Sequence, residues 1–196
     1  MSHKRNILTA LALVALLAVA FPRQGAAQRL AVKTNVLSWA AMTPDLGVEI
    51  VTGERTSLSL SFFGTDQPFN LPWQLLAVQP EFRFWFNGRP LTREYVGVST
   101  FGARYAVTLP AGADRENVFR GDAVAAGLSG GYVFNMGKRW NFELSGGTGL
   151  LFFRQKRYLS TDKYDDYFVE EISKPNQWGV KLFPVKLAAT FIYIIR

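Results

Sequence analysis

A period-two alternation of apolar and polar residues recurs along the chain, and it is the feature that most restricts the fold. In the segment VQPEFRFWFNG, alternate positions hold Phe82, Phe84 and Phe86, and the positions between them hold Glu81 and Arg83. Successive side chains leave a β-strand on opposite sides, so this segment is predicted to be a strand with one apolar and one polar face. A soluble sandwich would bury the apolar face, whereas a membrane barrel would turn it to lipid.

Eight segments carry this alternation, and no segment after residue 28 has the period of a helix of useful length. The predicted strands cover residues 29–38, 45–52, 56–63, 75–87, 94–107, 122–135, 139–154 and 181–195. In the fifth segment the apolar residues change parity, which predicts a β-bulge near Gly102. Pro80 has no N–H group to donate, so a bulge or a missing ladder bond is expected there. In the last segment, Val185 and the odd-numbered residues after it form the apolar face.

The connections between these segments alternate in length. Short turns are predicted at 52–55, 87–93 and 135–139, and long connections at 64–74, 108–121 and 155–180. Outer-membrane barrels have an even number of strands, with short turns on the periplasmic side and longer loops outside. We therefore predict an all-β fold, an eight-stranded antiparallel transmembrane β-barrel with short periplasmic turns and longer extracellular loops.

The first 27 residues have the pattern of a secretory signal peptide. A basic start precedes an apolar run from Ile7 to Ala20, and small residues follow as far as Ala27. The run has 14 residues, fewer than the roughly 20 that a membrane-spanning helix needs. We expect cleavage after Ala27, which leaves residues 28–196 as a single barrel domain in the outer membrane of a Gram-negative type of cell.

Histidine and cysteine are missing from this predicted mature domain. The only histidine is His3, in the signal peptide, and the chain has no cysteine. Serine and cysteine hydrolases need an imidazole, and zinc or copper sites need these same ligands. We expect a non-enzymatic protein with no catalytic residues, no metal site and no cofactor. No basic stripe interleaved with aromatic residues is present, so nucleic acid is not an expected partner.

Six charged residues fall on the polar faces of the predicted strands. The parity directs toward the barrel interior the side chains of Lys33, Glu49, Glu81, Arg83, Glu143 and Lys186. Three acids and three bases can pair there, and each needs a partner because an isolated buried charge is costly. An eight-stranded barrel is just wide enough inside for side chains. We therefore favour a polar plug, with a gate or narrow ion path as the alternative.

The aromatic residues are predicted to meet the membrane. Phe82, Phe84 and Phe86 are expected to face lipid. Two interfacial belts are expected from Trp39, Trp73, Trp140, Trp178 and Tyr193, because aromatic rings favour the headgroup region. The alternative is that these tryptophans are scattered through an ordinary core.

The last long connection, residues 158–179, is rich in tyrosine and acids. A possible protein-docking surface is formed by Tyr164, Asp165, Asp166, Tyr167 and Phe168. Exposed tyrosine-rich loops are typical of recognition surfaces. The acids do not have the spacing of an EF-type calcium loop. A solvated hairpin extension is the alternative interpretation.

Four blocks of the sequence carry a family resemblance. They are LAVKTNVLSWAAMTPDLGVEI (30–50), LAVQPEFRFWF (76–86), YVGVSTFGARY (95–105) and GYVFNMGKRWNFELSGGTG (131–149). The chain resembles a domain-of-unknown-function family of small outer-membrane barrels common in Bacteroidetes. The resemblance implies an outer-membrane barrel without established catalytic residues. It also implies a gene position near fimbrial or other surface-assembly genes.

The resulting functional hypothesis is a structural or accessory barrel. Its extracellular loops would contact a surface assembly or a larger membrane complex, so its partners would be outer-membrane lipid and a protein in that membrane or at the cell surface. The alternative is a narrow pore or a carrier of a small molecule across the outer membrane. A third hypothesis is a soluble periplasmic barrel of lipocalin type.

Overall fold

The computed structural model describes residues 29–110, 115–161 and 177–195. The predicted signal peptide lies outside the described residues, as do Tyr164, Asp165, Asp166, Tyr167 and Phe168 of the predicted docking loop. The elements are β1 (Leu30–Asn35), α2 (Val36–Ala40), β2 (Asp45–Val51), β3 (Thr56–Asp66), the 3₁₀ turn η1 (Pro68–Asn70), β4 (Trp73–Trp85), β5 (Arg93–Pro110), β6 (Arg115–Asn135), β7 (Trp140–Thr161) and β8 (Gln177–Ile195).

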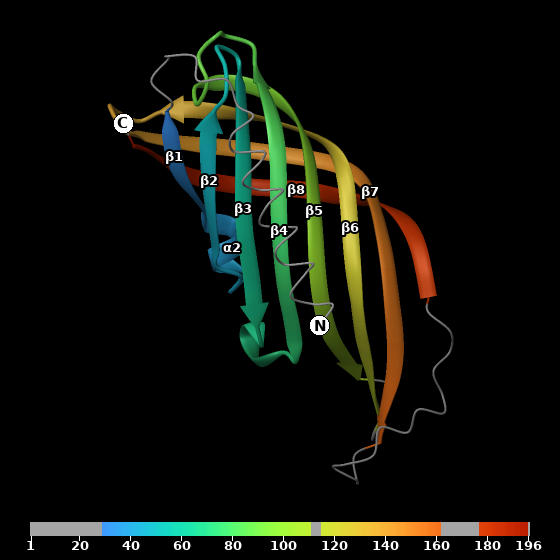
Figure 1. Cartoon of the computed structure of the whole chain (residues 1–196). Coiled ribbons are helices and arrows are strands. Elements are labelled where there is room, and N and C mark those ends of the chain that lie inside the picture. Colours follow the sequence, from blue (N-terminus) through green and yellow to red (C-terminus); the bar gives the residue numbers. More distant parts are fainter. Residues whose placement is uncertain (1–28, 111–114, 162–176, 196) are drawn as a thin grey trace, which may run out of the picture.

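The eight strands form a closed antiparallel barrel in which each strand pairs with its neighbours in sequence (Figure 1). β1 closes the ring against β8, with Leu30 opposite Ile195 and Asn35 opposite Thr190. The predicted eight-stranded antiparallel fold is confirmed. Among the described residues, no helix is both long enough and apolar enough to cross a membrane.

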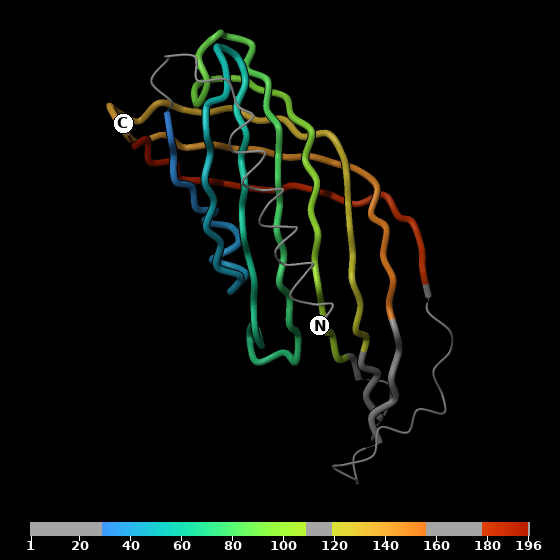
Figure 2. The backbone as a smooth tube through the Cα atoms, in the orientation of Figure 1, coloured from blue at the N-terminus to red at the C-terminus, as the bar shows by residue number. Residues whose placement is uncertain are grey.

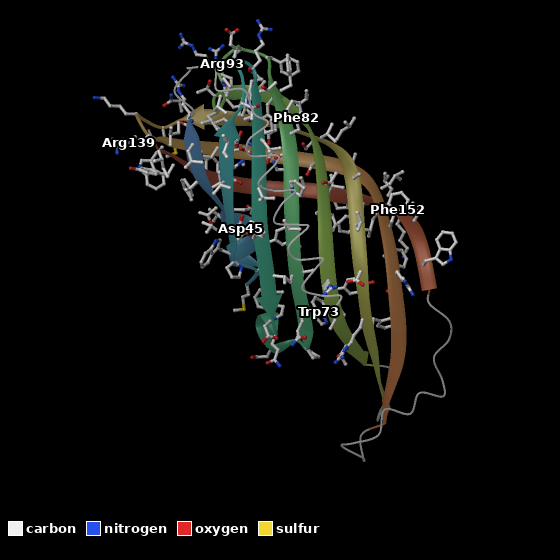
Figure 3. All side chains as sticks on the ribbon, in the orientation of Figure 1. Asp45, Trp73, Phe82, Arg93, Arg139 and Phe152 are labelled. Atoms are coloured by element: carbon white, nitrogen blue, oxygen red, sulfur yellow. The ribbon has the colours of Figure 1, made fainter. Side chains whose placement is uncertain are left out.

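The two faces of the wall differ sharply in polarity. In β4, Phe82 is 49% exposed and Phe84 is 38% exposed, while Arg83 between them is 1% exposed. Figure 3 shows Phe82 on β4 and Phe152 on β7 with their rings on the outside of the wall. The apolar residues therefore cover the exterior, and the charged residues fill the interior.

The wall is uneven in height, because β1 and β2 have 6 and 7 residues whereas β5 to β8 have 18 to 22. The tube in Figure 2 shows β5 to β8 extending beyond β1 and β2 at the end away from Ile195, toward the bottom and right of the view. Much of the chain predicted as long loops is paired strand instead: β3 and β4 pair as far as Asp66 and Gln74. The short connections, 52–55, 86–92 and 136–139, all lie at the other end.

The first predicted strand, 29–38, ends early. β1 stops at Asn35, whose side-chain oxygen accepts from the Leu37 N–H at 3.1 Å and caps α2. The Asp45 carboxylate holds the same turn by accepting from the Asn35 N–H at 2.6 Å and from the Ser38 hydroxyl at 3.0 Å. A capping side chain of this kind favours helix initiation over strand extension.

The bulge predicted near Gly102 is wrong. β5 keeps one register against β6 along its whole length, from Arg93 opposite Val133 to Pro110 opposite Glu116. The apolar residues change parity because the barrel interior at that level holds an aromatic ring, and Phe101 lines an internal cavity. The ladder from β4 to β5 is interrupted beside Pro80, between the Val78–Gly102 and Glu81–Ser99 pairs, as its missing N–H predicts.

A β-bulge is present elsewhere, between β7 and β8. Gly147 pairs with Lys186 and Gly149 with Phe183, so two residues of β8 lie opposite one residue of β7. Val185 was predicted on the exterior apolar face, but it is 4% exposed and lines the interior. The extra residue turns Val185 inward while Lys186 keeps its inward direction.

Candidate functional site: the charged interior of the barrel

Arg83 lies at the centre of the barrel interior and contacts three carboxylates from three strands. Its Nη1 is 2.9 Å from Glu49 Oε2 of β2 and 2.8 Å from Glu143 Oε2 of β7. Its Nη2 is 2.6 Å from Glu81 Oε2 of β4 itself. The planar guanidinium can serve several acceptors at once, which an ammonium at the same place could not do with this geometry.

Two lysines complete the charge network, which we define as Lys33, Glu49, Glu81, Arg83, Glu143 and Lys186. Lys33 Nζ is 2.8 Å from Glu49 Oε2 and 3.4 Å from Glu143 Oε2. Lys186 Nζ is 2.6 Å from Glu81 Oε2 and 3.4 Å from Glu143 Oε1. The six residues assigned to the interior by parity are thus brought into one connected cluster.

Neutral side chains satisfy the remaining carboxylate oxygens. Ser57 donates to Glu49 Oε1 at 2.5 Å, Ser129 donates to Glu81 Oε1 at 2.6 Å, and the Tyr95 hydroxyl donates to Glu143 Oε1 at 2.7 Å. The charge network has three acids and three bases, so it is formally neutral. A buried network is stable only when every member has its partners, and here each carboxylate oxygen has at least one.

Tyr95 and Trp85 extend the charge network toward the short-turn end. The Arg83 guanidinium lies 4.4 Å from the centre of the Tyr95 ring, and Trp85 donates its indole N–H to Ser57 at 2.9 Å. Gly131 permits this approach, because a Cβ there would lie 2.9 Å from the Tyr95 ring. The ring therefore combines a cation–π contact with a hydrogen bond to Glu143.

An apolar seal closes the short-turn end of the interior; its members are Ala31, Trp85, Leu91, Tyr95, Val133 and Ile192. Leu91 comes from the turn between β4 and β5 and is fully buried. Asn141 holds this turn inward by donating from Nδ2 to the Leu91 carbonyl at 2.6 Å. Leu91 has a φ of 69°, which is unfavourable for a side chain of its size. Its burial and the Asn141 contact offset that strain.

A chamber of about 340 Å³ lies on the opposite, long-loop side of the charge network. Lys33, Glu81, Arg83, Glu143 and Lys186 form its floor. Its walls combine apolar and uncharged polar side chains, including Phe63, Leu75, Phe101, Ser61 and Gln79. Gln79 crosses the interior, donating from Nε2 to Ser99 Oγ at 3.1 Å and to the Val185 carbonyl at 2.7 Å.

The residues predicted to meet lipid or the interface lie on the exterior of the wall. Phe82, Phe84 and Phe86 are exposed, as are Trp39, Trp73, Trp140 and Trp178. Figure 3 shows Trp73 at one end of the barrel and Arg93 and Arg139 at the other. Trp140 packs against Tyr193, with ring centres 4.9 Å apart. The fifth tryptophan, Trp85, is buried in the apolar seal.

Sequence reasoning did not identify several members of this site. Trp85 shares the face of Glu81 and Arg83, so parity alone could have assigned it to the interior. Tyr95 has the same strand parity as Gly97 on the inward face of β5, so parity could have assigned Tyr95 to the interior as well. Leu91 gave no signal, because a turn residue has no strand parity.

In the described part of the chain, no three histidine, cysteine or acidic side chains are grouped so that they could hold a metal ion. The charged groups bind one another, so the geometry supports rigidity and closure of the interior.

The chain belongs to a family of proteins of unknown function. The family model described as "Protein of unknown function (DUF3575)" matches residues 11–195. The prediction of a domain-of-unknown-function family is therefore confirmed, and the family description names no activity, organism group or cellular location. No curated protein and no solved structure matches the chain.

Proposed function

We propose that this protein is a small, non-conducting, non-enzymatic outer-membrane barrel that serves as a structural or accessory component of a surface assembly. The observation that carries the proposal is the inverted polarity of the wall, with apolar residues outside and a neutral charge network inside. Soluble monomers rarely expose apolar patches beyond a few hundred Å². An apolar exterior is what a barrel in lipid requires.

The exterior supports a membrane location over a soluble periplasmic barrel. Four leucines on three strands of the wall are largely exposed: Leu76 on β4, Leu128 on β6, and Leu182 and Leu187 on β8. β4 to β8 have at least 13 residues each, more than the roughly 9–11 that a tilted strand needs to cross a bilayer. The ring also closes between β1 and β8, where Leu30–Asn35 pair with Thr190–Ile195, as a barrel in lipid requires.

The sealed interior supports an accessory role over a pore. A solute passing along the axis would have to separate Arg83 from three carboxylates and displace Leu91 from the apolar seal. Each such separation leaves a buried charge unpaired, which is strongly unfavourable. We therefore expect no open-channel state under ordinary conditions.

Location and conductance test the proposal together. The protein should fractionate with outer membranes, resist carbonate washing and migrate differently on gels before and after boiling. In planar bilayers, the wild type should show no steady current. Glu81→Gln, which removes a partner from Arg83 and Lys186, should produce leak events. Recovery in the soluble periplasm would exclude the location, and wild-type conductance comparable to a general porin would exclude the sealed interior.

A protein partner is the second part of the proposal. It is supported by the sequence of residues 158–179, which combines tyrosines with acids. Affinity purification from native membranes, with the full chain and with residues 162–176 deleted, identifies the partner.

A further inference from the structure

Between β8 and α2, the wall of the barrel changes from two paired strands to a strand that lies against a short helix. β1 pairs with β8 only from Leu30 to Asn35, and β1 and β2 are shorter than a membrane-crossing strand. Residues 177–189 of β8 therefore have no strand partner on that side among the described residues. The short helix α2 lies against β8 where a strand would continue (Figure 1).

Side chains satisfy part of the backbone of β8 at this break. Asn35 Nδ2 donates to the Leu187 carbonyl at 3.4 Å, and Asn35 Oδ1 accepts from the Ala189 N–H at 3.0 Å. Gln79 reaches the Val185 carbonyl from across the interior at 2.7 Å, and Pro184 has no N–H. Unsatisfied backbone groups are not tolerated in lipid. These contacts satisfy backbone groups of β8 at residues 185, 187 and 189.

The chamber reaches the wall at the same break. On one side it is lined by residues 183–188 of β8, and on the other by Ser38 and Ala41 of the α2 segment. On the short-turn side of the chamber, the charge network and the apolar seal close the path along the barrel axis. Residues on both sides of the break between β8 and α2 thus line the chamber, away from the sealed end.

We propose that the chamber binds a small, uncharged amphipathic molecule that enters sideways from the lipid, between β8 and α2. This inference rests on the proposed membrane location. The walls offer apolar contact through Phe63, Leu75 and Phe101 and hydrogen-bonding groups through Ser61 and Gln79. A volume of about 340 Å³ lies at the small end of the roughly 300–1,000 Å³ usual for ligand pockets.

The preference for an uncharged molecule follows from the pairing of the charged side chains that form the floor of the chamber. The charges of the floor are paired within the neutral charge network, and the Asp45 carboxylate in the wall accepts hydrogen bonds from Asn35 and Ser38. Among the described lining residues, an added carboxylate would therefore find no cation without a partner. A buried charge without a partner is costly, whereas a hydroxyl or amide needs only a hydrogen bond. An aliphatic alcohol fits this requirement, and the corresponding carboxylate does not.

Cysteine labelling in proteoliposomes tests the route, because the chain has no cysteine of its own. Ala103→Cys places the thiol in the chamber wall, Arg104→Cys places it on the exposed exterior, and Ala31→Cys places it in the apolar seal. Each variant is treated with N-dodecylmaleimide, which partitions into lipid, and with a sulfonated maleimide, which does not.

After normalisation to Arg104→Cys, the dodecyl reagent should label Ala103→Cys faster than the sulfonated reagent by about tenfold or more, because each methylene favours partition into the bilayer. Ala31→Cys should resist both reagents. Equal rates at Ala103→Cys, or faster labelling by the sulfonated reagent, would mean entry from water and would overturn the proposal. Failure of both reagents at this position would overturn it as well.

Competition tests the class of ligand. 1-Decanol should protect Ala103→Cys from labelling, and decanoate at the same concentration should protect it less. Stronger protection by decanoate, or no protection by either compound, would refute an uncharged-ligand site. A carbonate wash of the same vesicles separates the two proposals: release of the wild type overturns the membrane location and the inference, whereas retention without lateral labelling overturns the inference alone.

Discussion

Replacing Arg83 by methionine tests the charge network directly, because Met removes the charge while keeping an apolar side chain of comparable length. The interior then holds three carboxylates and two ammonium groups, for a net charge of −1. Glu49 keeps Lys33 at 2.8 Å and Glu81 keeps Lys186 at 2.6 Å. Glu143 keeps the Tyr95 hydroxyl, but both of its remaining ammonium contacts are at 3.4 Å. Glu143 is therefore the carboxylate left without close compensation.

Removing one partner of a buried ion pair costs about 3–5 kcal/mol. We expect Arg83→Met to lower the free energy of unfolding by that amount in urea titrations of lipid-reconstituted protein, followed by tryptophan fluorescence. Arg104→Met is the matched control. Its partner Asp122 is 3.1 Å away, and the two side chains are 85% and 69% exposed, so a loss of only about 0–1 kcal/mol is expected.

The double variant Arg83→Met/Glu143→Gln supplies the decisive comparison. It restores a neutral interior of two acids and two bases, and the new amide can still accept from Tyr95. Most of the stability lost in Arg83→Met should return. A double variant less stable than Arg83→Met, or an Arg83→Met loss no larger than that of Arg104→Met, would refute the view that charge balance holds the interior together.

Three further predictions concern the exterior of the wall, the apolar seal and residues 162–176. Phe84→Arg should lose about 2–4 kcal/mol in bilayers because it places a charge in lipid, while Phe84→Leu should lose little; equal urea midpoints for the two variants would contradict a lipid-facing position. Leu91→Ala should cost about 2–5 kcal/mol by leaving a cavity in the apolar seal, measured in the same titration, and an unchanged midpoint would show that the seal does not depend on this side chain. Deletion of residues 162–176 should leave a folded, heat-modifiable barrel but reduce co-purification of the partner; unchanged co-purification would favour the solvated hairpin extension.

The period-two pattern was sufficient to predict the barrel and the direction of most side chains, because strand parity is a local property of the backbone. It placed Glu81 and Arg83 inside and Phe82 and Phe84 outside without any knowledge of the neighbouring strands. Parity failed at β8, where the bulge turns Val185 inward. A bulge depends on how two strands pair, and the sequence of one strand does not specify it.

The charge network shows the same division. The sequence by itself determined that six charges, balanced in sign, would face one interior, because parity and composition decide this. Only the tertiary structure decided that Arg83 would bind Glu49 and Glu143, which lie 34 and 60 residues away along the chain. Strand order and register bring these carboxylates to one level of the barrel. Leu91 lies in a turn, where strand parity does not apply. It reaches the interior because the closed ring leaves an apolar space on the short-turn side of Arg83, and this space forms only when the barrel closes.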